Sequence, residues 1–483
     1  MRRLSITVAA LTVALLAACA LEPDYQRPAV SLPSQWDTAT VAVSTPTAEA
    51  WWAGFADPEL LQLLQSAIAN NPDLAIAVDR VLEARDSVTV AHAAKFPVVG
   101  FNGLPTDPVS TQLRTTNSGR VDVDSNIFEL SFNASYELDF WQRVHNQELA
   151  AHADYRASLA DAGTVQIGLL SMVANTYFDL RMLDERRRIE QQRLDIADQR
   201  LRLSQLRQSA GRTGNTPVAA ARLASSDCEA RLAAIGRERQ LAVSTLALLL
   251  GKNPEDLQLS ESTLRGSVQA QPPPEGLPSS LLERRPDLLA AEARLQSAHA
   301  EIAVAHADLF PQVALTAKAG FVTGAVRNLA KAGSTVFGIG PDISLPIFDA
   351  GRLKAELDAS RWRDDAAVLE YRKAVRQALA EVERALLDYQ AAVESAQRSN
   401  ADTMIEQAQL RQVAAQIDAG RSSRFDRLDV EERLLDRDGQ ALFAYREQLA
   451  GLVALYQALG GGWNPDQAMP HRDWVGTADN AVR

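Results

Sequence analysis

Hydrophobic and polar side chains alternate along residues 127–140 with almost no exception. Because successive side chains of a strand point to opposite faces, this segment would have one apolar and one polar face. The two-residue period ends at Trp141, and no proline follows before Pro217. This stretch has room for a helix of roughly 70 residues, about 100 Å long at ~1.5 Å per residue. The pattern predicts an amphipathic strand that leads directly into a very long helix, as in a membrane pore extended by a helical tube.

The same order of elements occurs twice, which indicates an internal duplication. A helical pattern from Pro72 to Pro97 recurs 214 residues later, from Pro286 to Pro311. After the strands and loops that follow, the offset is constant at 209 residues, and the matched positions are Arg143 with Arg352, Asp179 with Asp388, Gly211-Arg212 with Gly420-Arg421, and Leu250-Gly251 with Leu459-Gly460. A constant offset over so long a stretch predicts two structural repeats.

The repeats and the segments around them give the predicted organisation of the chain. The predicted parts are a signal peptide (1–18), a lipid-anchored extended tether (19–50), a first repeat (51–251), an equatorial insert (252–285), a second repeat (286–462) and a C-terminal equatorial segment (463–483). The predicted elements of the repeats are strands at about 97–103 and 126–140, a long helix at 141–210, a return helix at 216–250, strands at 311–322 and 335–348, a long helix at 350–419 and a return helix at 424–460. Residues 104–125 are polar and are predicted to form an exposed loop.

Rows of apolar residues at seven-residue spacing mark the long and return helices. The return helix of the second repeat carries Leu428, Leu435, Leu442, Leu449 and Tyr456. Such a row keeps one seam against a partner helix and implies a left-handed supercoil. The first long helix has two rows on nearly opposite flanks, one with Ile196 and one with Leu194. Two seams fit a helix in a wall with neighbours on both sides, and they also fit a helix in a solid bundle.

The start of the chain reads as a targeting segment. Two arginines precede an apolar stretch from Leu4 to Ala18, which is too short to span a bilayer comfortably. Leu16-Ala17-Ala18-Cys19 resembles a bacterial lipobox, which implies cleavage before Cys19 and acylation of that residue. Ala20 follows the cysteine, so the resemblance implies the outer membrane. The alternative is an ordinary signal peptide with an incidental cysteine. Cys228 is then the one remaining cysteine, predicted to be a small buried side chain.

Composition and motifs argue against nucleic-acid binding and catalysis. The net charge is −12, with no basic run to neutralise phosphates. No nucleotide-binding loop, nucleophile elbow or zinc-protease motif is present. His145 and His152, like His299 and His306, are seven residues apart, about two helical turns, which disfavours shared coordination of one metal. We therefore predict no enzymatic activity, no metal and no cofactor other than a covalent lipid on Cys19.

Four membrane strands per chain cannot close a barrel. The smallest bacterial barrels have about eight strands, and an open sheet edge in lipid leaves backbone groups unpaired. The chain is therefore expected to form oligomers in the membrane. Three chains of four strands each would supply twelve strands.

The sequence resembles the TolC/OprM-type outer membrane factors, and in particular their lipoprotein branch. The resemblance rests on the lipobox, the duplicated helices that end in Phe-Pro, and the segments Glu137–Arg143 and Leu345–Arg352. Gln142 departs from the family, in which a glycine usually precedes the arginine. The resemblance implies a mainly α fold with a membrane β part: a trimeric 12-stranded β-barrel, four strands per chain, continued by a long α-helical barrel.

The resemblance also implies a function. The homotrimer would be the exit duct of a tripartite efflux pump, working with a periplasmic adaptor (membrane fusion protein) and an inner-membrane pump of the RND type. An outer-membrane duct for type I protein secretion is the first alternative. A soluble helical bundle with buried strands is the second.

Family resemblance places a periplasmic gate at the turns between the long and return helices. Phe425 matches a bulky constricting position, and Asp426 and Asp429 match acidic ones. In a trimer these acids would form carboxylate rings with raised proton affinity. Glu432 stands where some members have an arginine, which leaves a closing salt bridge in doubt. The alternative for Asp426 is local, because Ser423 and Asp426 have the spacing of a capping box. Replacing Phe425 and Asp429 by alanine is predicted to make a leakier channel.

The tips of the two turns carry matched arginines. Arg212 and Arg421 occupy equivalent places in the two repeats. They are candidates for contact with the helical hairpin of the adaptor. The competing interpretation is an ordinary solvated turn.

Overall fold

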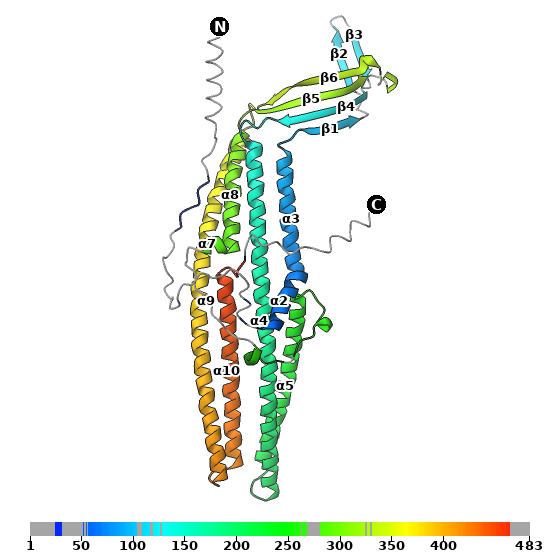
Figure 1. The fold of residues 1–483 in the computed structure, drawn as a ribbon. Coiled ribbons are helices and arrows are strands. Elements are labelled where there is room, and N and C mark those ends of the chain that lie inside the picture. Colours follow the sequence, from blue (N-terminus) through cyan, green and yellow to red (C-terminus); the bar gives the residue numbers. More distant parts are fainter. Residues whose placement is uncertain are drawn as a thin grey trace. The chain divides into compact units, whose positions relative to one another are not determined.

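The computed structural model describes residues 25–30, 52, 55, 57–103, 109–115, 119–125, 128–260, 262–267, 281–323, 326–328 and 331–463. The signal peptide, Cys19 and most of the tether and C-terminal segment therefore lie outside the described residues. The chain divides into a sheet unit (residues 1–29, 81–157 and 291–371) and a helix unit (residues 30–80, 158–290 and 372–483). Both are traced in Figure 1.

The elements are mainly helical, with a few strands, as predicted. In chain order they are α2 (Pro58–Asn70), α3 (Pro72–Ala93), β1 (Val98–Gly103), β2 (Val109–Thr115), β3 (Gly119–Ser125), β4 (Phe128–Glu137), α4 (Arg143–Ser209), α5 (Thr216–Leu249), α6 (Leu264–Ser267), α7 (Leu281–Arg284), α8 (Pro286–Ala307), β5 (Gln312–Thr323), β6 (Thr335–Ser344), α9 (Arg352–Asp418) and α10 (Arg424–Ala458). A 3-10 turn, Pro254–Asp256, follows α5.

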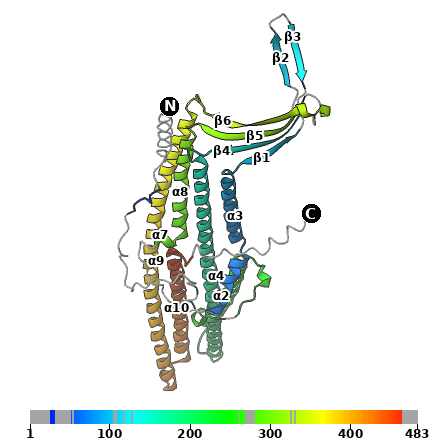
Figure 2. The same ribbon diagram turned by 45° about the horizontal axis from the view of Figure 1, so that its top comes forward.

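The sheet unit contains a four-stranded antiparallel sheet in the order β1-β4-β5-β6 (Figure 2). Phe132 of β4 lies opposite Phe101 of β1 and Ala319 of β5, and Ala319 lies opposite Phe337 of β6. These residues share the apolar face because paired residues in a ladder point the same way. The other face carries Glu129, whose carboxylate is 2.6 Å from the Lys318 ammonium nitrogen. The predicted alternation thus separates an apolar from a polar face across the sheet.

The prediction of a plain loop at residues 104–125 was wrong. β2 and β3 pair there as an antiparallel hairpin, with Val109 opposite Ser125 and Thr115 opposite Gly119. The segment Val121-Asp122-Val123-Asp124 alternates apolar and polar residues, which was a strand signal. The many polar residues around it masked that signal.

Each strand-to-helix joint uses left-handed backbone and an aspartate cap. Gln142 has φ 59°, and its counterpart Gly351 has φ 88°. Asp139 accepts hydrogen bonds from the backbone N–H of Val144 and of His145, at 3.1 and 2.8 Å. Asp349 plays the same part for α9 and accepts from the Leu353 N–H at 2.9 Å. Gln142 therefore adopts a left-handed conformation like that of Gly351, at a conformational cost.

Gln142→Gly is expected to stabilise this joint by about 1 kcal/mol or less. A left-handed residue with a Cβ costs roughly 1–2 kcal/mol, and the larger entropy of glycine in the unfolded chain takes back part of that gain. Thermal unfolding of the purified protein measures the effect. Gly168→Ala is the calibration, because Gly168 is inside α4, its added Cβ meets open space, and removing a helical glycine should stabilise the protein by roughly 0.5–1 kcal/mol. A lower unfolding temperature for Gln142→Gly would contradict the prediction.

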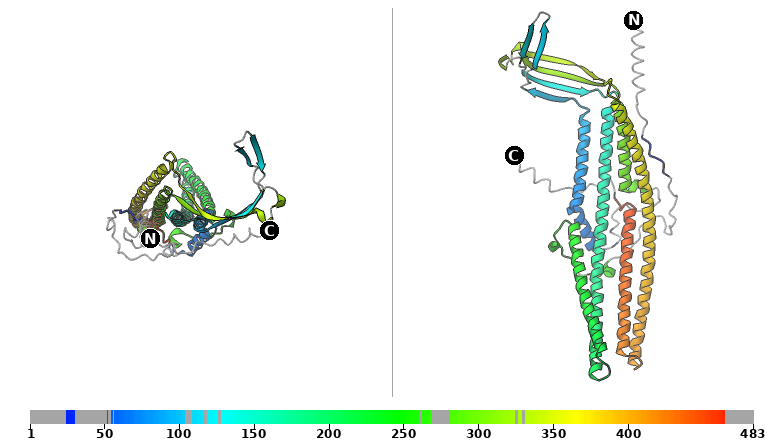
Figure 3. Two further views of the ribbon diagram at one scale, coloured as in Figure 1. Left: turned by 90° about the horizontal axis from the view of Figure 1, so that it is seen from above. Right: turned by 180° about the vertical axis from the view of Figure 1, so that it is seen from behind.

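In the helix unit four long helices lie side by side in the order α5, α4, α10, α9 (Figure 3). Ion pairs define each neighbour relation: Glu190 of α4 with Arg231 of α5 at 2.6 Å, Arg193 of α4 with Asp436 of α10 at 2.8 Å, and Glu406 of α9 with Arg433 of α10 at 3.5 Å. The predicted row of α4 meets that of α10, because Ile196 packs with Leu428 and Leu435. Within this unit α4 has a neighbour on each flank, which fits the two seams predicted from the sequence.

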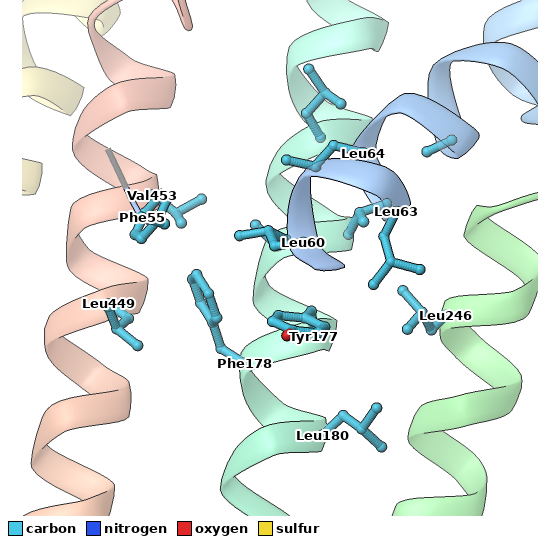
Figure 4. Close-up of a cluster of buried hydrophobic side chains, with 14 of the residues drawn as sticks. Phe55, Leu60, Leu63, Leu64, Tyr177, Phe178, Leu180, Leu246, Leu449 and Val453 are labelled. Atoms are coloured by element: carbon cyan, nitrogen blue, oxygen red, sulfur yellow. The ribbon is translucent and has the colours of Figure 1, made fainter. Parts of the chain in front are cut away.

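The largest core cluster lies where α2, α4, α5 and α10 meet (Figure 4). Phe178 of α4 and Phe55 are fully buried, with ring centroids 5.2 Å apart. Leu246 of α5 and Leu449 of α10 are also fully buried in this cluster. Leu449 belongs to the seven-residue row predicted from the sequence. Burial of such side chains contributes about 1.5–3 kcal/mol each and holds the four helices together.

Candidate functional site

The candidate site lies at the C-terminal ends of the two long helices, α4 and α9. Gly211 and Gly420 have φ 67° and 69°, the left-handed conformation that ends a helix. The Arg212 N–H donates to the Arg207 carbonyl at 2.9 Å, and the Arg421 N–H donates to the Gln416 carbonyl at 2.8 Å. These bonds satisfy the last carbonyls of each long helix and let the chain reverse into α5 and α10.

Arg212 and Arg421 are exposed and hold these turns through their backbones. Their guanidinium groups extend into solvent from matched positions. This arrangement fits both the adaptor contact and the solvated turn considered above. Contact between these two arginines and an adaptor protein stays a prediction.

Asp426 forms the capping box of α10. Its carboxylate accepts from the Ser423 N–H at 2.7 Å, and the Ser423 hydroxyl accepts from the Asp426 N–H at 3.3 Å. These hydrogen bonds lower the pKa of Asp426. This lowered pKa belongs to a single chain, and the raised proton affinity expected of a carboxylate ring in a trimer stays a prediction. Asp426 has the local capping role that the spacing allowed.

Asp429 is joined to α4 by an arginine that the sequence analysis missed. The Arg200 guanidinium is 2.6 Å from the Asp429 carboxylate and 3.1 Å from that of Glu432. A closing salt bridge would need a positive charge near Glu432, and Arg200 supplies that charge from α4. A signal was present, because Arg193, Arg200 and Arg207 recur every seven residues on α4. Residues at that spacing lie along one helix flank and can follow an antiparallel neighbour.

Phe425 is half-buried beneath the next arginine of this row. The Arg207 guanidinium carbon lies 4.0 Å from the centroid of the Phe425 ring. Such a cation–π contact is worth roughly 0.5–1 kcal/mol at an exposed site. Together with Arg200, it connects the end of α4 to the start of α10. We call Arg200, Arg207, Phe425, Asp429 and Glu432 the tip latch.

The tip latch can perform electrostatic and steric work but no covalent chemistry. Its charged pairs are partly exposed, with about half of the Asp429 and Glu432 side chains accessible. Each pair is therefore worth about 0.2–1 kcal/mol and weakens in salt. Contacts of this strength can hold two helices together and still release them. Among the described residues no group of His, Cys, Asp and Glu could hold a metal ion.

Comparison with known proteins assigns the family. The outer membrane efflux protein model matches residues 63–252 and 277–461. The pyoverdine export outer membrane protein OpmQ of Pseudomonas aeruginosa is 33% identical, over 98% of this chain and 100% of OpmQ. The solvent efflux pump outer membrane protein SrpC of Pseudomonas putida is 32% identical, over 94% of this chain and 97% of SrpC.

Solved structures agree with the sequence comparison. The structure of the outer-membrane channel OprN matches with a TM-score of 0.82 and 29% identity, over 92% of this chain and 100% of that chain. Members of this family are outer-membrane channels of efflux systems and not enzymes. The chain therefore belongs to the outer membrane efflux protein family, and it is an efflux exit channel.

Proposed function

We propose that three copies of this chain form the passive exit duct of a tripartite efflux pump, a 12-stranded β-barrel continued by an α-helical barrel. The observation that carries the proposal is the four-stranded sheet, whose two edges have no partner strand among the described residues and whose one face is apolar. An open edge in lipid costs several kcal/mol for each unpaired backbone group, so the edges need partner strands. In the helix unit, α5 and α9 are the flanks that would meet neighbouring copies.

Paired contacts in the two halves support the internal duplication. The Asn71 side chain donates to the Leu249 carbonyl at 2.9 Å, and the Arg285 side chain donates to the Ala458 carbonyl at 2.9 Å. Arg285 follows Asn71 by 214 residues, and Ala458 follows Leu249 by 209, the two offsets found in the sequence. The family model also matches two separate segments of the chain. α4 and α9 have 67 residues each.

Assembly and transport can be tested on the purified protein. Native mass measurement in detergent is expected to give a trimer, and reconstitution in planar bilayers is expected to give ion-conducting channels. A monomer that stays dispersed without detergent would contradict the proposal. It would favour the soluble bundle.

The lipid anchor on Cys19 and the outer-membrane location complete the proposal for the N-terminus. Support comes from the described part of the tether, where the Arg27 guanidinium binds the Glu292 carboxylate of α8 through two hydrogen bonds of 2.7 and 2.6 Å. Cys19 lies six positions before Tyr25 in the chain, which limits the distance between the two residues to about 20 Å. Metabolic labelling with palmitate is expected to mark the wild type and not Cys19→Ser.

The proposed partners are a periplasmic adaptor, contacted through Arg212 and Arg421, and an inner-membrane pump of the RND type. The names of relatives support small-molecule export, because OpmQ is a pyoverdine export protein and SrpC belongs to a solvent efflux pump. A duct for type I protein secretion would have the same architecture with other partners. Gene neighbours separate the two: an adaptor with a pump, or an ABC exporter with a secreted substrate.

We propose further that the tip latch holds the periplasmic end closed. Arg200→Gln removes two pairs in each of three chains, and at about 0.2 kcal/mol or more per pair the open state should gain roughly tenfold or more. Single-channel recording in planar bilayers at low salt is expected to show higher conductance than in the wild type. Phe425→Ala with Asp429→Ala is expected to act in the same direction.

Arg427→Gln is the matched control for the latch. Arg427 pairs with Glu431 of its own helix at 2.8 Å, so its loss leaves the α4–α10 contact intact. Its conductance should equal that of the wild type. Equal conductance for Arg200→Gln and Arg427→Gln would show that the tip latch does not hold the channel closed. Because salt screens exposed charges, the difference between the two variants should shrink at high ionic strength.

A further inference from the structure

The four-stranded sheet presents matching backbone edges on β1 and β6. The Leu138 N–H donates to the Val313 carbonyl at 2.8 Å, which continues the β4–β5 ladder at a hydrogen-bonded pair. Backbone groups alternate direction along a strand, so this pair fixes the pattern across the sheet. Odd-numbered residues of β1 and of β6 point their N–H and C=O groups to the free edges. Phe101 on β1 and Ile343 on β6 are two of them.

The chain contains its own template for covering these edges. β4 precedes the long helix α4 as β6 precedes α9, and β1 follows α3 as β5 follows α8. The β4–β5 ladder therefore joins the last strand of one repeat to the first strand of the next. β6 of one copy beside β1 of a second copy would repeat that junction between chains.

We infer that β6 and β1 of two copies pair with Ser344 opposite Asn102. This inference rests on the proposed trimer and specifies its register. Ser135 lies opposite Thr316 in the template. The offset of 209 carries Ser135 to Ser344, and the offset of 214 carries Asn102 to Thr316.

Two features of the strands agree with this register. Outward odd-numbered residues meet each other, with Ile343 opposite Gly103. The faces match, because Asn102 lies opposite Ser131 on the polar face and Ser344 lies opposite Gln312 on the same face.

Apolar side chains at the joint between β6 and α9 are exposed in the single chain. They indicate which residues β1 of a second copy would cover. Within the chain the joint is closed, because Trp141 stacks on Phe310 with centroids 4.7 Å apart and donates to the Pro311 carbonyl at 2.8 Å. At the corresponding joint of β6, Ile347 is 95% exposed and Phe348 is 88% exposed. Phe96, the counterpart of Phe310, is 56% exposed. With Ser344 opposite Asn102, the residues of the second copy opposite Ile347 and Phe348 are Val99 and Val98, each 67% exposed in the single chain.

Cysteine cross-linking tests the register in the full-length protein. Ser344→Cys with Asn102→Cys is made in a Cys228→Ala background, expressed in the outer membrane and oxidised. In the template this position is a non-hydrogen-bonded pair, in which side chains are closest. Covalent trimers are expected on non-reducing gels. A bond within one chain is excluded, because β1 and β6 are three strand spacings apart, about 14 Å, and disulfides need Cα atoms within about 7 Å.

Two shifted pairs make the result specific. Ser344→Cys with Phe101→Cys places the thiols on opposite faces and is expected to give no covalent trimer. Ser344→Cys with Gly100→Cys reports a slip of two residues. Cross-linking of that pair in place of Asn102→Cys would overturn the register and leave the trimer standing. A monomeric mass for the unmodified protein would overturn the trimer itself. A further test co-expresses the single variants Ser344→Cys and Asn102→Cys. Because each chain then carries one of the two cysteines, a trimeric mass together with disulfide-linked dimers, and no covalent trimers, would support the register.

Discussion

Gly320→Val is expected to prevent stable assembly of the four-stranded sheet. A Cβ at Gly320 would lie 2.5 Å from the Cα and 2.7 Å from the Cβ of Ser131, and closer still to the Leu130 carbonyl oxygen. These are mostly backbone atoms of the neighbouring strand β4, and they cannot move aside without breaking the ladder. Overpacking against fixed atoms costs about 3 kcal/mol or more, and each trimer would carry three such sites.

The fraction of protein that runs as a trimer on gels without heating, and the amount of protein recovered from the outer membrane, measure this effect. Gly338→Val is the matched control, because Gly338 lies opposite Lys318 on the same polar face and its added Cβ meets open space. The control should assemble like the wild type. Normal assembly of Gly320→Val would show that β4 and β5 can separate there, which would contradict the close approach.

Arg181→Met is expected to lower the free energy of unfolding by about 3–5 kcal/mol. The Arg181 side chain is fully buried in the helix unit and contacts the Glu59 carboxylate, the Ser260 carbonyl, and Asp184 at 3.3 Å. Its guanidinium carbon also lies 4.8 Å from the Tyr177 ring centroid. It thus joins α2, α4 and the segment after α5. Methionine would leave buried acceptors without their donor.

Arg186→Met is the control on the same helix. Arg186 pairs with Glu238 of α5 at 3.2 Å, and both side chains are about half exposed. Loss of such a pair should cost less than about 1 kcal/mol. Denaturant unfolding followed by tryptophan fluorescence compares the variants. Equal midpoints for Arg181→Met and Arg186→Met would contradict the structural role of the buried arginine.

Acid should reduce the difference between the wild type and Arg181→Met. Burial opposes ionisation of Glu59, but hydrogen bonds from Ser260 and the charge of Arg181 prevail and lower its pKa. A carboxylate with a lowered folded pKa contributes stability above its unfolded pKa, about 4.3, and loses it as pH falls through the folded value. The gap between the two proteins should therefore be full at pH 7 and smaller below about pH 4.

The pattern of the sequence was enough to locate the long helices and the strands of the four-stranded sheet. The proline-free stretch after Trp141 corresponds to α4, Arg143–Ser209, and the alternation before it to β4. Long helices are determined locally, because each hydrogen bond closes within four residues and breakers mark their ends. The hairpin of β2 and β3 was missed for the converse reason, since strands depend on a partner that a local pattern does not specify.

The candidate gate was only partly predictable. Asp426 had two possible roles in the sequence, and the capping box with Ser423 is a local interaction that spacing alone allowed. The pairing of Asp429 with Arg200 joins residues 229 positions apart. That pair depends on which helix lies beside α10, and nothing near Asp429 in the sequence specifies the neighbour.

The order of apolar and polar residues by itself determined an amphipathic sheet and two long helices, because periodicity and chain breaks act over short distances, and it predicted a repeated plan. Only the tertiary structure decided that α4 lies between α5 and α10, that Gly320 meets the backbone of β4, and that Arg200 faces two acids. Those contacts depend on the register between segments far apart in the chain. Register is set by the packing of the whole unit and not by any one segment.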